Sequence, residues 1–148
     1  MSSRLKTVSK VARIIDHQKE LLEFQIRKIH QRLLLERDRL TGLEKDLRNT
    51  VERFGEKADR QQIHNGLELG RLYDAASLYG KQIEQKKAAL SRVRKELEAQ
   101  QALWDEAYKK KKAIEALENK LAFQEKREER ILEQKNMDYL SLSRGARL

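Results

Sequence analysis

The apolar residues of this chain recur at alternating spacings of three and four, which is the pattern of a heptad repeat. In the first half, the a positions are Leu5, Ala12, Lys19, Ile26, Leu33, Leu40, Leu47 and Phe54, and the d positions are Val8, Ile15, Leu22, Ile29, Glu36, Leu43, Thr50 and Lys57. We call these positions the first seam. A seam that stays in phase over so many heptads predicts a left-handed coiled coil, because a repeat of 3.6 residues would drift away from it.

A second seam with the same spacing occupies the other half of the chain. Its apolar members are Leu72, Ala76, Tyr79, Ile83, Leu90, Val93, Leu97, Trp104, Ala107, Ile114 and Leu121, and its polar members are Lys86, Gln100, Lys111 and Glu118. The stretch from Trp104 to Asp138 contains no Pro and no Gly, so nothing in it interrupts an α-helix. A helix this polar cannot fold alone, and the first seam is the partner that we expect for it.

Three glycines, Gly55, Gly66 and Gly70, separate the two seams, and Asn65 lies beside the second of them. We predict that the chain reverses at Asn65 and Gly66, with Gly55 and Gly70 as alternatives, because glycine tolerates the backbone conformation that ends a helix. The prediction is a single all-α domain, a long antiparallel two-helix coiled-coil hairpin with a C-terminal helix overhang. Its expected parts are a helix over residues 3–63, a turn at 64–67, a helix over 68–141 and a frayed tail at 142–148.

A turn at Asn65 and Gly66 also predicts which residues of the two helices face each other and where the first helix ends along the second. It places Leu40 opposite Leu90, Leu33 opposite Leu97, and Ile26 opposite Trp104. The first helix is then exhausted near Lys126, so the end of the second helix is expected to have no partner in the chain. That overhang contains the apolar residues Ile131, Leu132, Met137, Tyr139, Leu140 and Leu142. An apolar stripe on an unpaired helix predicts a docking surface for another protein.

Composition supports long helices and narrows the function. Charged residues make up 39% of the chain, aromatic residues make up 5%, and Pro and Cys are absent. This profile is typical of coiled coils, and the absence of Cys excludes disulfides. No apolar run reaches membrane-spanning length and the N-terminus lacks a secretory signal, so we expect a cytoplasmic protein. The net charge of +9 favours an acidic partner.

The basic residues gather where the hairpin would bring the two termini together. Before the first acid at Asp16 lie Arg4, Lys6, Lys10 and Arg13, and near the other terminus lie Lys135, Arg144 and Arg147. The run Lys109–Lys112 is interpreted as part of a solvated helix face or as a contact to an acidic partner. Nucleic acid is not expected, because basic residues alternate with acids over most of the length and no known recognition motif is present.

Candidate catalytic and metal-binding residues are few. His17, His30 and His64 have no second ligand at the spacing of a metal site. Asp16 and its neighbour His17 are interpreted as surface groups, because two helices offer no pocket to desolvate them. The chain has no Gly-rich phosphate loop and no nucleophile motif, so we expect neither an enzyme nor a cofactor.

Part of the chain resembles the FliJ family of bacterial flagellar type III export proteins. The residues that carry the resemblance are the tryptophan of LWDEAYKKK, Leu117 of ALENK, and the closing EQKNMD from Glu133 to Asp138. The resembling stretch extends from Ala75 to Asp138, and the opening RLKTVSKVARI is also similar. The resemblance implies a non-catalytic stalk of the export apparatus, located in the cytoplasm and peripherally associated with the membrane at the flagellar base through its partners.

The resemblance also implies partners and the residues that bind them. The end that carries both termini would engage a hexameric export ATPase (FliI), through Leu5, Arg13, Gln134, Lys135, Met137 and Asp138. The second helix would engage the cytoplasmic domain of the export gate (FlhA), through Tyr73, Ala75 and Tyr79. Export chaperones are further partners in that family. Two alternatives stay open: a coiled-coil scaffold that dimerises in parallel through its heptads, and the stalk of a related, non-flagellar secretion system.

Overall fold

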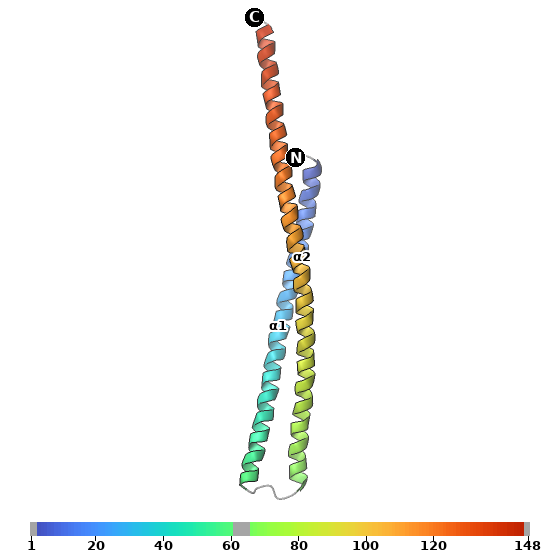
Figure 1. Cartoon of the computed structure of the whole chain (residues 1–148), viewed down its shortest axis with the longest axis vertical. Coiled ribbons are helices and arrows are strands. Elements are labelled where there is room, and N and C mark those ends of the chain that lie inside the picture. Colours follow the sequence, from blue (N-terminus) through green and yellow to red (C-terminus); the bar gives the residue numbers. More distant parts are fainter. Residues whose placement is uncertain (1–2, 61–65, 147–148) are drawn as a thin grey trace. The chain divides into compact units, whose positions relative to one another are not determined.

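The computed structural model describes residues 3–60 and 66–146, and these residues form two long helices. Helix α1 spans Ser3–Asp59 and helix α2 spans Gly66–Ala146. The helices pack against each other, which confirms the predicted all-α class and agrees with a helical hairpin. The contacts divide the chain into two units, one of Met1–Glu23 with Leu103–Leu148 (unit 1) and one of Phe24–Ala102 (unit 2). In each unit a part of α1 lies beside a part of α2 (Figure 1).

The ends of the helices differ from the predicted ends. Helix α1 ends at Asp59, before the predicted boundary at 63, and the Arg60 amide donates a 3.0 Å hydrogen bond to the Glu56 carbonyl. The predicted turn at 64–67 is wrong for its second half, because Gly66 begins α2. Asn65 lies outside the described residues. The alternative turns were also wrong, since Gly55 and Gly70 lie inside helices.

Helix α2 also continues further than the sequence suggested. It extends through Ala146, so residues 142–146 are helical rather than frayed. Nothing in this stretch removes a backbone N–H or forces a turn, because the chain contains no Pro. Arg144 lies in the last turn, where a cation interacts favourably with the negative end of the helix dipole.

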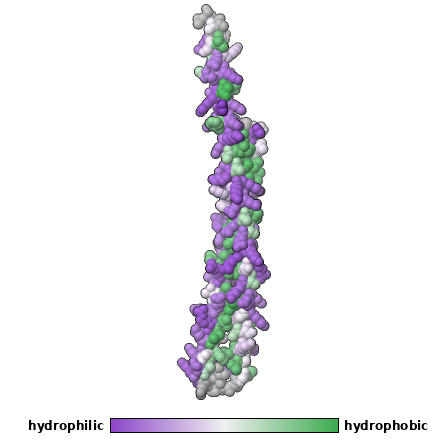
Figure 2. Space-filling view, in the orientation of Figure 1, coloured by the Kyte–Doolittle hydropathy of each residue, from purple (hydrophilic) through white to green (hydrophobic). Residues whose placement is uncertain are grey.

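Both seams lie where the helices are covered. Every first-seam position from Leu5 to Phe54 is buried or half-buried, and Lys57 is the exposed exception. All members of the second seam are likewise buried or half-buried. In unit 2 the best-buried cluster consists of Ile29, Val93 and Leu97, with Ile26 and Leu33 packed against it. Polar residues cover much of the visible surface, with apolar patches between them (Figure 2).

The pairing of the helices is offset from the predicted pairing. Leu33 packs against the cluster that contains Leu97, as predicted. The Arg32 side chain, however, contacts Glu96 at 3.3 Å, about one helical turn short of position 99, where a turn at Asn65 and Gly66 would place its partner. Helix α1 ends at Asp59 rather than at 63, which agrees with an offset toward lower residue numbers.

No helix within residues 3–60 and 66–146 is both long enough and apolar enough to cross a membrane.

Candidate functional site

The C-terminal part of α2 is the longest exposed stretch of the described chain. Residues 126–142, which we call the C-terminal segment, are exposed without interruption. The segment carries large apolar side chains that are between 47% and 75% exposed: Ile131, Leu132, Met137, Tyr139, Leu140 and Leu142. Six such side chains on five turns of helix are an unusual concentration for a surface that stays in water.

Three of these residues continue the second seam. The heptad positions that follow Leu121 are Glu125, Glu128, Leu132, Lys135, Tyr139 and Leu142, so three of these six are apolar. Leu121 and Glu125 are half-buried, whereas Leu132, Tyr139 and Leu142 are exposed. In Figure 1 the red end of α2 extends past the blue end of α1, both of which belong to unit 1. The apolar stripe that covers α1 earlier in α2 therefore continues into the C-terminal segment without cover from the described part of α1.

The residues expected to bind the ATPase are only partly brought together. Gln134 donates a 3.2 Å hydrogen bond from Nε2 to Oδ1 of Asp138, one turn later on the same helix. Met137 is 66% exposed, and Lys135 is also exposed. Leu5 is buried, with 6% of its surface exposed, so it contributes to packing between the helices rather than to the surface.

Arg13 lies apart from the C-terminal segment. It is exposed, and it lines a shallow hollow of about 310 Å³ with residues of both helices. The other residues that line this hollow are Ser9, Ala12, Asp16, Lys111, Glu115 and Glu118. Gln134 lies roughly 24 Å farther along α2 than Glu118, at about 1.5 Å per residue. A small partner protein therefore cannot contact Arg13 and Gln134 at the same time, whereas a large partner can.

The N-terminal end of α1 is basic and exposed. Arg4, Lys6, Lys10 and Arg13 are all exposed, and the first turn of α1 contains no acidic residue. Positive side chains at the N-terminus of a helix oppose the helix dipole, which favours acidic residues there. An anionic partner surface would offset this unfavourable interaction, so the basic end of unit 1 favours an anionic partner.

The residues expected to bind the export gate lie near an apolar hollow in unit 2. The hollow has a volume of about 480 Å³. It is lined by Thr50, Val51, Phe54, Gly66, Leu69, Gly70, Leu72, Tyr73 and Ala76. Tyr73 is 74% exposed, whereas Ala75 and Tyr79 are half-buried and do not line the hollow.

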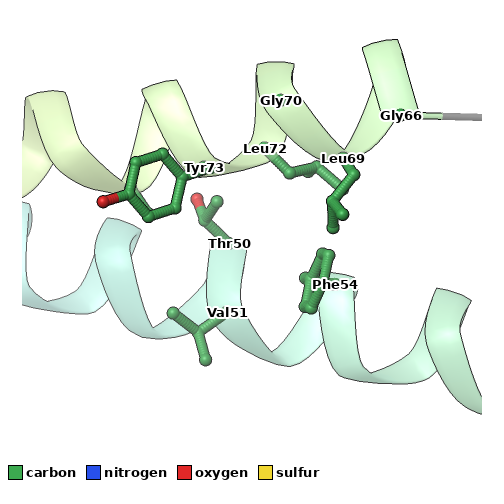
Figure 3. Close-up of a pocket in the computed structure, with 9 residues that line it drawn as sticks. Thr50, Val51, Phe54, Gly66, Leu69, Gly70, Leu72 and Tyr73 are labelled. Carbon is green, nitrogen blue, oxygen red and sulfur yellow. The ribbon is translucent and has the colours of Figure 1, made fainter.

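Figure 3 shows Leu69 and Leu72 of α2 pointing toward Phe54 of α1. The sequence indicated Phe54 and Leu72 as seam residues but did not predict a hollow beside them. Gly66 and Gly70 are the signal that was available, because a residue without a side chain leaves space between two helices. A Cβ added at Gly70 would meet no other atom within 4 Å.

Polar residues that interrupt the two apolar seams form contacts between the helices. In unit 2 the Lys86 ammonium lies 3.1 Å from Oε2 of Glu36, and Arg39 contacts the other oxygen of that carboxylate at 3.2 Å. The hydrogen bond from Lys86 holds the pKa of the Glu36 carboxyl below its ordinary value. Opposite charges at seam positions of the two helices were the signal that could have predicted this pair.

A second polar group lies in unit 1. The Lys111 ammonium is 2.8 Å from Oδ1 of Asp16, and this hydrogen bond raises the pKa of Lys111 and lowers that of Asp16. Lys19 is 3.7 Å from Oε1 of Glu23, and the same oxygen accepts a 3.2 Å hydrogen bond from Nε1 of Trp104. Trp104 is thus held by a polar contact as well as by packing, and its ring stacks on Tyr108 at 5.3 Å.

Among the described residues, no three His, Asp or Glu side chains come together as a set that could hold a metal ion.

Comparison with known proteins adds no relative. No protein-family model, curated protein or solved structure matches this chain. The helices, the exposed C-terminal segment and the paired charges are therefore the observations from which a function is argued.

Proposed function

We propose that this protein is a non-catalytic stalk of the flagellar type III protein export apparatus, engaging an export ATPase ring at one end and the export gate along α2. The observation that carries the proposal is the C-terminal segment. The stretch Glu133–Asp138, on which the resemblance to the FliJ family is closest, falls inside the segment where large apolar side chains are exposed. Exposed apolar side chains at helical spacing are the usual anchors of a helix that docks on another protein.

The proposed architecture is an antiparallel coiled coil with a C-terminal overhang. The order of the contacts supports it: in unit 2 the partner of Lys57 is Glu68, that of Glu36 is Lys86, and that of Arg32 is Glu96. Partners thus move forward along α2 as the residue moves backward along α1. A stalk of this kind needs no active site, because it acts by holding two partners at fixed positions on one helix pair.

The ATPase would be engaged by the basic end of α1 and by the C-terminal segment. Met137 and the neighbouring apolar residues supply buried area in the complex, and Gln134, Lys135 and Asp138 supply polar contacts around them. Arg13 would contact the ring farther along the pair of helices. Leu5 would act indirectly, by packing α1 onto α2. Because the end is basic, binding to an acidic surface is expected to weaken as salt rises.

The export gate would be engaged near the start of α2. Tyr73 is the most exposed of the three candidate residues, and it borders the apolar hollow of unit 2. Ala75 and Tyr79 are half-buried, so they would shape the surface more than they would contact the gate directly. Export chaperones are further partners in this proposal, and the protein would be held at the cytoplasmic side of the flagellar base by its partners.

The direct test is to mix the purified protein with the export ATPase of the same organism and to measure hexamer assembly and ATP hydrolysis. Wild-type protein is expected to increase both, and Met137→Glu and Leu140→Glu are expected to abolish the increase. The matched control is Phe123→Glu, because Phe123 is on the same helix, is 67% exposed and lies outside the C-terminal segment. An ATPase that responds to none of these proteins would contradict the coupling role.

The alternative is a structural scaffold, or the stalk of a related secretion system. The exposed seam residues Leu132, Tyr139 and Leu142 support the scaffold alternative, because the same segment of a second copy could cover them. Sedimentation equilibrium of the purified chain separates the readings, since the stalk is expected to remain a monomer and the scaffold to dimerise. Comparing flagellar with non-flagellar export ATPases then identifies the apparatus.

A further inference from the structure

Four half-buried charged residues at seam positions have partners of opposite sign within the chain. Glu36 belongs to the first seam and Lys86 to the second, and their side chains are 18% and 32% exposed. Both carboxylate oxygens of Glu36 are engaged, one by Lys86 and one by Arg39. A charge at a position that usually holds an apolar residue loses part of its hydration, so it needs such partners to be tolerated.

The same arrangement occurs in unit 1, with the seam charges on other residues. Lys19 of the first seam and Lys111 of the second are 17% and 24% exposed. Lys111 is neutralised across the helix pair by Asp16 of α1, and it also lies 3.8 Å from Glu115. Lys19 is neutralised by Glu23, which is held in turn by Trp104 of α2. These four of the six charged seam residues, the others being Lys57 and Glu118, therefore have partners of opposite sign in contacts of 2.8–3.8 Å.

The contacts between the helices, Lys86 with Glu36 and Lys111 with Asp16, would be lost if two copies of the chain associated in parallel, whereas a contact within one helix such as Lys19 with Glu23 would remain. In a parallel two-stranded coiled coil, each a or d position faces the same position of the other strand. Lys19 would then face a second Lys19, and Glu36 a second Glu36. Lys86 and Lys111 would meet their own kind in the same way. Like charges placed opposite each other in a partly dehydrated interface destabilise it strongly.

We infer that the seam charges Lys19, Glu36, Lys86 and Lys111 select the partner of each seam: Glu36, Lys86 and Lys111 have partners on the other helix of the same chain, and all four oppose a second copy aligned in parallel. The inference uses the hairpin of the proposed function but not its role in export. It predicts that a chain with two long apolar seams does not form a parallel coiled coil with its own copies.

The first experiment exchanges charges within a pair. Glu36→Lys and Lys86→Glu are each expected to lower the Tm of the purified chain by about 5 °C, because each places like charges together. The exchanged double variant restores the opposite pair and is expected to recover more than half of the loss. Arg32→Glu is the matched control, because the Arg32–Glu96 contact is between side chains 56% and 46% exposed, and its Tm is expected to change by less than about 2 °C. A double variant no more stable than the weaker single variant would overturn the inference.

The second experiment tests the exclusion of a second copy. Lys19, Glu36, Lys86 and Lys111 are all replaced by Leu, and Leu22→Cys is added as the only cysteine of the chain. Leu22 is a seam position, so this cysteine forms a disulfide with its own copy only in a parallel, in-register pair. Under mild oxidation the apolar variant is expected to give a cross-linked dimer, and the wild-type background with Leu22→Cys is expected to remain a monomer of about 17.5 kDa. Equal cross-linking in both backgrounds, or none in the apolar variant, would overturn the inference.

Both experiments use the purified chain without an ATPase. A failure of the proposed export function would leave their results unchanged, and a failure here would leave the ATPase assay open. The two proposals can therefore be rejected separately.

Discussion

Two parts of α2 share the spacing of their apolar residues but not their surroundings. At Val93 and Leu97 the stripe is buried, with 6% and 9% of these side chains exposed, against Ile29 of α1. In the C-terminal segment the same heptad positions carry Leu132 and Tyr139, which are 60% and 72% exposed. Heptad spacing alone therefore does not mark a core. Where the described part of α1 covers the stripe, its burial stabilises the fold, and in the C-terminal segment the stripe is exposed.

The largest difference between the two parts is expected in stability. Leu97→Ala removes buried methyl groups and leaves a gap between the helices, so it is expected to lower the free energy of unfolding by about 2–4 kcal/mol. Leu140→Ala alters a side chain that is 55% exposed and is expected to change it by less than about 0.5 kcal/mol. Urea unfolding followed by circular dichroism measures both values. Equal effects would mean that the C-terminal segment is covered in solution.

The second difference is expected in binding. A chain truncated after Glu125 lacks the C-terminal segment but keeps both seams up to Leu121, so its Tm is expected to fall by no more than about 4 °C. Its affinity for the export ATPase is expected to fall at least about tenfold, because the exposed apolar anchors are gone. Binding is measured by surface plasmon resonance. Unchanged affinity would move the ATPase-binding surface to another part of the chain.

A smaller effect on stability is expected at Gln100, a polar residue of the second seam. Within the described residues, Oε1 of Gln100 is buried and accepts no hydrogen bond. Gln100→Leu removes this atom and is expected to stabilise the chain by about 1 kcal/mol. The control is Gln101→Leu, because the neighbouring Gln101 is exposed and is expected to give no gain. A loss of stability at position 100 would show that Oε1 is hydrated in solution.

The smallest effect is expected from pH. The hydrogen bond from Lys86 lowers the pKa of Glu36, and that from Lys111 lowers the pKa of Asp16. Each carboxyl binds protons more weakly in the folded chain than in the unfolded chain, so its contribution is complete above the ordinary carboxyl pKa. The contribution is lost as the pH falls through that value and on through the lowered one. Thermal melts between pH 7 and about pH 3 measure this loss.

Two variants separate this contribution from general acid unfolding. Glu36→Gln is expected to lower the Tm at pH 7 and to make the loss on acidification smaller. Glu84→Gln is the control, because the Glu84 side chain is 77% exposed, and it is expected to leave the melting curves unchanged. Identical acid profiles for wild type and Glu36→Gln would show that the Glu36–Lys86 contact contributes nothing measurable.

Much of the fold could be predicted, because the heptad spacing of residues such as Leu, Ile and Val defines both seams. The helix ends could not, because Gly55, Gly70 and the residues after 141 are compatible with either a helix or a turn. The candidate site shows the same division. The apolar residues of the C-terminal segment could be named in advance, but the burial of Leu5 and the distance of Arg13 from Gln134 depend on where α1 lies along α2.

The two long helices and the apolar seam of each could be predicted from the amino-acid sequence, because helix propensity and heptad spacing are local properties. Which residues contact one another depends on the packing of the two helices: Glu36 contacts Lys86, Lys111 contacts Asp16, and Phe54, Leu69 and Leu72 border a hollow. The position of one helix along the other decides which residues meet. A heptad repeat does not fix this position, because a shift by seven residues again places apolar positions opposite each other.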